Sequence, residues 1–132
     1  MKGFIAPIEK DTRDNQDFRK VWYTGKHCQL VLMSVPPGGE IGTEVHQEND
    51  QFFRCEAGEG KVVIDGHETA ITDGDAVIVP AGAVHNIINT SATDGLKLYT
   101  IYAPPHHRDG IVRHTRQEAE AHDAPFDGAT TE

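Results

Sequence analysis

The sequence is poor in cysteine and in long hydrophobic runs. Its two cysteines, Cys28 and Cys55, form no CxxC pair and no zinc-knuckle spacing. This excludes a disulfide-stapled scaffold, and we predict two buried, reduced thiols in a protein of the reducing cytoplasm. No apolar stretch has the length of a membrane span, and none follows Met1 as in a secretory leader. We therefore expect neither a membrane segment nor a signal peptide.

Positive charge is also in short supply. The chain has 12 Lys and Arg against 21 Asp and Glu, which gives a formal net charge of −9. This balance argues against nucleic acid or an anionic membrane as a partner held by bulk electrostatics. A small-molecule substrate is the expected partner. The charged fraction of 25% is ordinary for a folded protein, and 132 residues suffice for one domain with its own core.

Helical periodicity is nearly absent, whereas short strand-like segments recur at even spacing. Glycine-rich turns separate these segments, and Asp65-Gly66 is a typical sequence for a tight hairpin turn. Many short strands of this kind indicate an all-β antiparallel sandwich or barrel. The predicted strands are residues 21–25, 29–35, 43–46, 51–55, 61–64, 68–71, 76–79, 85–89 and 96–102.

The flanks differ from this central region. Residues 1–28 begin with a polar stretch of mixed charge, and we interpret them as a surface arm with at most one short strand. Residues 29–105 form the predicted barrel. In residues 106–132, Thr115-x-x-Glu118 matches a capping box for a short C-terminal helix, followed by a predicted mobile tail from Pro125.

Two spaced motifs carry the candidate chemistry. The first motif runs from Gly38 to Gly58, and the second from Gly74 to Asn89. The first reads Gly38, five residues, Glu44-x-His46, four residues, Gln51, six residues, Gly58. The second reads Gly74, five residues, Pro80-x-Gly82, two residues, His85, three residues, Asn89. Both motifs flank short apolar segments, so together they bring four metal-capable side chains toward one predicted pocket.

The metal prediction rests on the cost of burying polar groups. Residues two apart in a strand face the same side, so Glu44 and His46 are expected to point together. Gln51 shares its predicted strand face with apolar residues and is expected to point inward, and His85 opens a later strand. Such a quartet inside an apolar barrel is costly unless something satisfies it. A divalent metal ion does so: zinc, iron, manganese and nickel all suit two imidazoles and a carboxylate.

Two alternatives stay open at this point. Asp50 is a competing carboxylate to Gln51, which as an amide is at best a weak fourth ligand. Without a metal, Glu44 would be a desolvated carboxylate with a raised pKa, hydrogen bonded to His46 or His85. That arrangement is typical of a general base.

The two motifs resemble those of the cupin superfamily, whose members fold as a double-stranded β-helix, also called a jelly-roll barrel. The second motif agrees at each defined position, and the first departs at Glu44 and Gln51, where the family often has His and Glu. The chain as a whole resembles single-domain proteins labelled mannose-6-phosphate isomerase-like. Phosphomannose isomerases use Gln, His, Glu and His on zinc, so Glu44, His46, Gln51 and His85 repeat that set with two members exchanged.

The resemblance implies a metal-dependent small-molecule enzyme, isomerase-like or dioxygenase-like, acting through a metal-stabilised enolate-like anion. We expect Glu44 to move a proton. Tyr99 and Tyr102 end the last predicted barrel strand, and one of them, Tyr99 by preference, is expected to donate a catalytic hydrogen bond to substrate. A non-catalytic sensor or storage cupin and the metal-free base using Glu44 are the alternatives. In cupins the N-terminal extension commonly crosses to a second subunit, so Trp22 and Tyr23 are expected at a homodimer contact.

Overall fold

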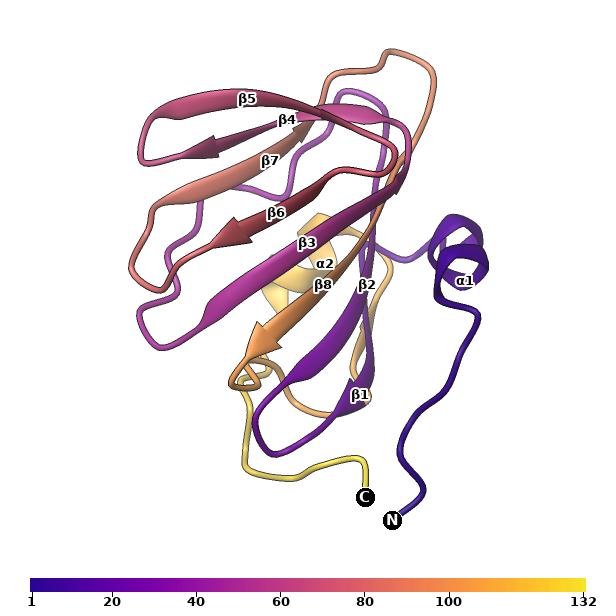
Figure 1. The fold of residues 1–132 in the computed structure, drawn as a ribbon, viewed down its shortest axis with the longest axis vertical. Helices are drawn as coiled ribbons and strands as arrows, with labels where there is room; N and C mark the ends of the chain where they lie inside the picture. Colours follow the sequence, from indigo (N-terminus) through magenta and orange to yellow (C-terminus); the bar gives the residue numbers. More distant parts are fainter.

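The computed structural model describes residues 1–132, and its centre is two antiparallel β-sheets packed face to face (Figure 1). The larger sheet has the strand order β6-β3-β8-β2-β1-β9, and the smaller has the order β5-β4-β7. This confirms the predicted all-β class and is consistent with a double-stranded β-helix. The strands are β1 (Arg19–Thr24), β2 (Gln29–Val35), β3 (Asp50–Ala57), β4 (Glu59–Ile64), β5 (His67–Thr72), β6 (Ala76–Val79), β7 (His85–Asn89), β8 (Leu96–Ala103) and β9 (Val112–Arg113).

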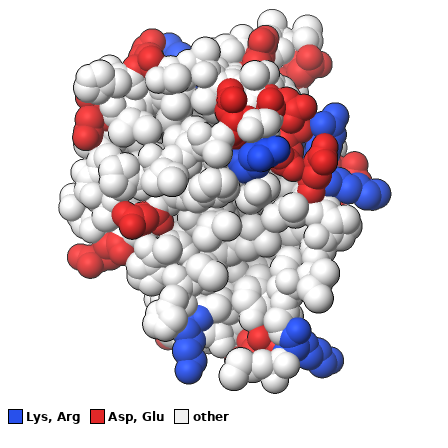
Figure 2. All heavy atoms as spheres, viewed as in Figure 1, with Lys and Arg blue, Asp and Glu red and all other residues white.

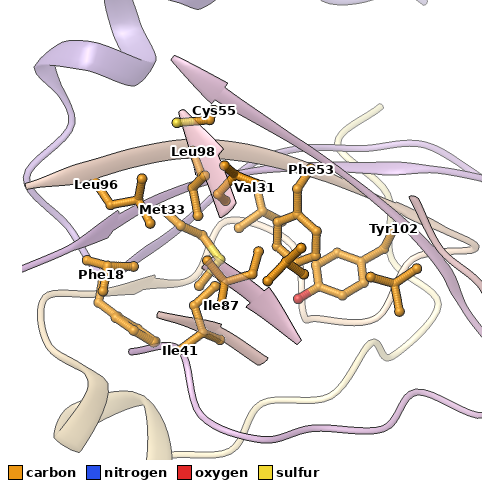
Figure 3. Close-up of a cluster of buried hydrophobic side chains, with 14 of the residues drawn as sticks. Phe18, Val31, Met33, Ile41, Phe53, Cys55, Ile87, Leu96, Leu98 and Tyr102 are labelled. Carbon is orange, nitrogen blue, oxygen red and sulfur yellow. The ribbon is translucent and has the colours of Figure 1, made fainter. Parts of the chain in front are cut away.

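Strand alternation builds the core between the sheets. Along β8 the side chains of Leu96, Leu98, Thr100 and Tyr102 are buried, whereas the residues that alternate with them are only partly buried. Val62 and Ile87 supply part of the opposite wall from the smaller sheet. Figure 3 shows these side chains meeting in one apolar cluster, with the Tyr102 ring at one end and Leu96 at the other. The period of two therefore decides which residues can reach a site inside the barrel.

The hairpin between β4 and β5 confirms the turn predicted at Asp65-Gly66. Both residues have positive φ, at 47° for Asp65 and 85° for Gly66. A two-residue turn of this kind matches the twist of the strands that it joins.

The predicted strand at residues 43–46 does not form. Gly42 adopts φ of 107°, and its N–H donates to the Asn86 side chain, 2.9 Å away, instead of joining a ladder. Pairing with β7 is thereby interrupted and resumes only as a single bridge between Glu44 and His85. The segment is a loop held at separate points along the smaller sheet.

A helix that the sequence did not reveal, α1 (Ile8–Asp14), lies within the predicted surface arm. It packs near β3 and β8, where Arg13 donates to the carbonyl of Glu56 and Thr12 is fully buried. Its apolar residues show no 3.6-residue repeat, so contact with the sheet stabilises it more than its own sequence pattern does. The same predicted arm also contains β1, which is a full member of the larger sheet.

The predicted C-terminal helix is confirmed as α2 (Arg116–Ala121). Thr115 caps it by accepting a hydrogen bond from the N–H of Glu118 at 3.1 Å, as the capping box requires. The segment after it runs back along the barrel, where the N–H of Thr131 donates to the carbonyl of Thr24 and the hydroxyl of Thr131 accepts from the N–H of Thr24. Both termini lie near β1 (Figure 1), and the N–H of Gly3 donates to Glu132. The mobility of this tail stays a prediction.

On the face shown in Figure 2, acidic and basic side chains gather together near α1, acidic ones stand apart on the opposite side, and few charges lie over the middle of the larger sheet. Among the ion pairs of the protein, Lys10 with Asp14 and Arg54 with Glu56 are each 2.8 Å apart. The structure also corrects the prediction for the cysteines, because Cys55 is buried but Cys28 is exposed. No helix combines the length and the apolar character needed to cross a bilayer.

Candidate metal centre

Two buried glutamines lie at the same end of the barrel, on either side of Tyr102. Tyr102 pairs with Gln29 across β2 and with Gln51 across β3. The Gln29 amide is fully used. Its nitrogen donates to Thr24 and to the carbonyl of His107, and its oxygen accepts from two backbone N–H groups after β8. Gln29 therefore holds the chain where it leaves the barrel and needs no ligand.

Gln51 is only half satisfied. The Thr100 hydroxyl donates its single proton to the carbonyl of Phe52, so it must accept from the Gln51 nitrogen, 3.0 Å away. This fixes the amide orientation and leaves the buried Gln51 Oε1 without a partner. The rival carboxylate, Asp50, is exposed and instead accepts from the N–H of Ala81 at 2.9 Å. Of the two residues, Gln51 is the one inside the barrel.

His85 is oriented by its own backbone neighbourhood. Its Nδ1 lies 3.0 Å from the carbonyl oxygen of Ala83, which can only accept, so Nδ1 carries the proton. In the neutral ring, Nε2 is then an acceptor with a free lone pair. That Nε2 is buried and has no hydrogen-bond partner. A backbone carbonyl on one nitrogen and a lone pair on the other is the arrangement of a metal-ligating histidine.

Glu44 and His46 converge with His85 even though the segment that carries them is not a strand. Backbone hydrogen bonds run both ways between Glu44 and His85, at 2.8 and 2.9 Å. The Glu44 Oε2 and His46 Nε2 atoms lie 3.0 Å apart. One ligand atom from each of the three residues lies within 4.8 Å of the other two. The predicted convergence is correct, but backbone bridging produces it rather than strand alternation.

The donor set fits a divalent cation. Two imidazoles, a carboxylate and an amide oxygen are suitable ligands, and the buried His85 Nε2 and Gln51 Oε1 lack any other partner. Burial opposes ionisation of Glu44, but the hydrogen bond with His46 and the charges of His46, Arg19 and His85 outweigh it. The pKa of Glu44 consequently lies below its usual value. This direction is opposite to the raised pKa expected for a metal-free base.

Tyr99 does not line the site. Its side chain leaves β8 on the outer face, where its ring lies 6.1 Å from that of Phe52. Tyr102, three positions later and therefore on the opposite face, is buried with its ring centre 5.6 Å from that of His46. The error was one of register. Period-two alternation counted from the buried Leu98 would have selected Tyr102.

His106 and His107, which follow the end of β8, extend the site. The His106 ring centre lies 4.3 Å from that of His46, and His106 stacks on Tyr102. His107 Nε2 lies 3.2 Å from the Tyr102 hydroxyl. Burial lowers the pKa of His106 to about 4 and lowers that of His107 further, so both rings are neutral at pH 7. Burial, aided by Glu44, raises the pKa of Tyr102, which keeps its proton.

A cavity of about 380 Å³ opens above Glu44, and its lining includes a positively charged side chain, Arg19, that the sequence did not reveal. Arg19 of β1 and both His106 and His107 line one side of it, and α2 lines the other. The buried Nε of Arg19 has no hydrogen-bond partner. No motif contains Arg19, and only the pairing of β1 with the barrel brings it to the site.

Comparison with known proteins agrees with this architecture. A cupin domain model matches residues 31–102. The protein YrkC of Bacillus subtilis is 44% identical over 126 residues, covering 91% of this chain and 67% of that protein. The crystal structure of BH2720 from Bacillus halodurans superposes with a TM-score of 0.89 at 40% identity, covering 92% of this chain and 96% of the other. A predicted oxalate decarboxylase from Thermotoga maritima superposes with a TM-score of 0.56 at 25% identity, over 60% of this chain and 68% of that one. The chain belongs to the cupin domain family.

Proposed function

We propose that this protein is a metal-dependent enzyme that acts on a small, oxygen-rich organic molecule. The observation that carries the proposal is the buried, unpartnered Nε2 of His85 beside Glu44 and His46. An imidazole nitrogen that is buried without a partner loses its hydrogen bonds to water and gains nothing in return. A cation held by these residues removes that cost.

Each residue has a distinct part in this proposal. His46, His85 and Glu44 hold the metal, and Gln51 adds an amide oxygen. A bound divalent cation supplies Lewis-acid stabilisation of negative charge on substrate oxygens. Tyr102 keeps its proton, and its buried hydroxyl lies 3.2 Å from His107 Nε2, so it supports His107, which lines the cavity.

Two reaction classes follow from the ligand set. Two histidines and one carboxylate resemble the facial triad of iron oxygenases, which supports dioxygenase-like chemistry. The same residues with Gln51 share their composition with the zinc site of phosphomannose isomerases, which supports isomerase-like chemistry. Both reactions require a proton to be removed or returned next to a charged oxygen.

A metal-free general base is the weaker alternative. A base that works near neutral pH benefits from a raised carboxyl pKa, whereas the pKa of Glu44 is lowered by His46 against the effect of burial. A ligand-binding cupin without catalysis shares the same metal site and differs only in turnover.

The test is metal binding by purified protein without an affinity tag. Zinc titrated into chelator-treated protein is expected to bind with one-to-one stoichiometry and to raise the unfolding temperature, since ligands of the folded state stabilise it. His85→Ala is expected to weaken zinc binding by at least about a hundredfold, because it removes an inner ligand. His67→Ala is the matched control, because His67 is an exposed histidine on β5.

Equal zinc affinity of the wild type and His85→Ala would overturn the proposal. Tight zinc or iron binding without turnover of sugar phosphates, diketones or hydroxy acids would favour the ligand-binding alternative.

A further inference from the structure

Arg19 lines the cavity above Glu44, and its guanidinium forms no ion pair with any acidic side chain of the protein. Arg116 also lines it, but Arg116 is paired with Glu120 at 2.9 Å and with Glu40 at 3.6 Å. Arg19 takes part in no ion pair within 4.0 Å, and its buried Nε has no acceptor. The two arginines share one cavity, and only Arg19 is left with donors to offer.

The position of Arg19 is fixed by its surroundings. Its backbone pairs with Arg113 of β9, the edge strand of the larger sheet, so β1 is held between β9 and β2. Its guanidinium carbon lies 5.6 Å from the centre of the Phe18 ring, which supports one side of the group. Arg19 and the candidate metal ligand Glu44 line the same cavity, so a molecule bound there can reach both.

From these observations we infer that Arg19 binds the carboxylate of the substrate, and that the substrate is a small oxygenated organic acid. This inference rests on the proposed function, because it places the acid beside the metal site. The planar guanidinium offers parallel N–H donors that match the two oxygens of a carboxylate. A bound carboxylate also supplies the acceptor that the buried Nε lacks.

Charge and size both narrow the ligand. Glu44, Glu120 and Asp123 also line the cavity, so a ligand with one negative charge meets less repulsion there than a phosphate dianion does. The volume of about 380 Å³ lies near the lower end of ligand pockets, which run from about 300 to 1,000 Å³. A carboxylic acid of a few carbons with a hydroxyl or oxo oxygen next to the carboxylate satisfies both limits.

Isothermal titration of zinc-loaded protein with matched acids and amides tests this inference. The probes are glycolate, lactate and malate, each beside its amide. Wild-type protein is expected to bind at least one acid about tenfold more tightly than its amide, as a charge-assisted hydrogen bond provides. Arg19→Met is expected to reduce this preference to about twofold or less, and Arg19→Lys to retain part of it because the charge stays but the fork is lost.

Lys20→Met is the control, because Lys20 is the next residue of β1 and lies over Trp22 in a separate surface hollow. It removes the same charge and is expected to leave the acid preference unchanged. A second readout needs no variant: the Nε–Hε nuclear magnetic resonance signal of Arg19 in the wild type is expected to shift with the acid and not with the amide.

The outcomes separate this inference from the proposed function. Zinc binding with an acid preference that survives in Arg19→Met, or with no acid bound at all, overturns the role of Arg19 and leaves the metal site standing. Failure of the wild type to bind zinc overturns both.

Discussion

The two ends of the barrel are built from the same strands and have opposite characters. At one end β8 contributes Leu96 and Leu98, and Leu98 pairs with Met33 and Cys55 in an apolar layer. At the other end the same strand contributes Tyr102, which pairs with the two buried glutamines. Burying the polar end costs more free energy than burying the apolar end. The polar end contains the metal-capable residues, and there the buried His85 Nε2 and Gln51 Oε1 have no hydrogen-bond partner.

The difference separates stability from function along one strand. The apolar layer excludes water and stabilises the fold, while the polar layer keeps unpaired groups that a ligand must satisfy. Gln29 and Gln51 sharpen the point, because they occupy equivalent places beside Tyr102. The protein uses every polar atom of Gln29 and leaves the oxygen of Gln51 free.

Leu98→Ala at the apolar end is expected to have the largest effect, and it tests whether stability and zinc affinity depend on different ends of the barrel. Leu98 is fully buried, and its truncation is expected to lower the free energy of unfolding by about 3 kcal/mol. The loss comes from the transfer free energy of the removed methyl groups and from the cavity that remains. Zinc affinity of the folded protein is expected to stay within about threefold of the wild type, since distant sites contribute independently. Urea denaturation and zinc titration measure the two effects. A loss of zinc affinity as large as that of His85→Ala would mean that the two ends are not separable.

Acid is expected to act through the polar end. The buried His107 has a lowered pKa, so on acidification below 6.5 the unfolded chain takes up a proton that the folded protein does not. Stability therefore falls with falling pH, by up to about 1.4 kcal/mol per pH unit for one such group. Glu44 acts in the same direction only at lower pH, because its stabilising contribution is present above 4.5 and is lost as the pH falls through its lowered pKa.

His107→Asn is therefore expected to flatten the dependence of unfolding free energy on pH between about 6.5 and 5. Chemical denaturation at several pH values measures this slope. His67→Asn on the exposed strand β5 is the control and is expected to keep the wild-type slope. An unchanged slope in His107→Asn would show that His107 titrates normally in the folded protein.

Gln51→Leu makes the polar end more apolar and tests whether Gln51 contributes to zinc affinity at the expense of stability. It removes the buried, unpaired Oε1 at the expense of one hydrogen bond to Thr100, so the metal-free protein is expected to gain up to about 1 kcal/mol. Zinc affinity is expected to fall by up to about tenfold, the effect of a weak ligand or supporting contact. Gain and loss are measured by urea denaturation and zinc titration of the same preparation. A less stable metal-free variant with unchanged zinc affinity would assign Gln51 a purely structural role.

The smallest effect concerns the cysteines. Cys55 belongs to the apolar layer, and burial raises its pKa to about 11, whereas Cys28 is exposed. A thiol reagent is expected to label Cys28 in the native protein at least about a hundredfold faster than Cys55, because only the accessible thiolate reacts. Mass spectrometry of the native and urea-unfolded protein separates the two sites. Equal labelling in the native state would show that the apolar end opens readily.

The sequence was sufficient for the barrel and for the metal-capable quartet because both depend on local signals. Gly-rich turns bounded the strands, and motif spacing selected Glu44, His46, Gln51 and His85. Motif spacing to Gly58 favoured Gln51 over Asp50 without deciding between them, and the structure has Gln51 buried and Asp50 exposed. These features need only a strand period and a turn vocabulary.

What the sequence did not reveal depends on tertiary contacts. Helix α1 is stabilised by packing near β3 and β8, and Arg19 reaches the cavity only because β1 joins the larger sheet. Tyr99 was chosen over Tyr102 because the register of β8 was not fixed by its sequence alone. The loop around Gly42 was mistaken for a strand, since its hydrogen bond to Asn86 links residues far apart in the chain.

The reciprocal backbone bonds between Glu44 and His85 have a consequence for how the site comes into being. They join two segments that are separated by the four strands β3 to β6, so the donor atoms meet only when the barrel seam closes there. A cation bound by the completed site would hold this seam closed and slow its reopening more than that of any other sheet edge. Slower hydrogen exchange at these two N–H groups with zinc than without it would measure this effect directly.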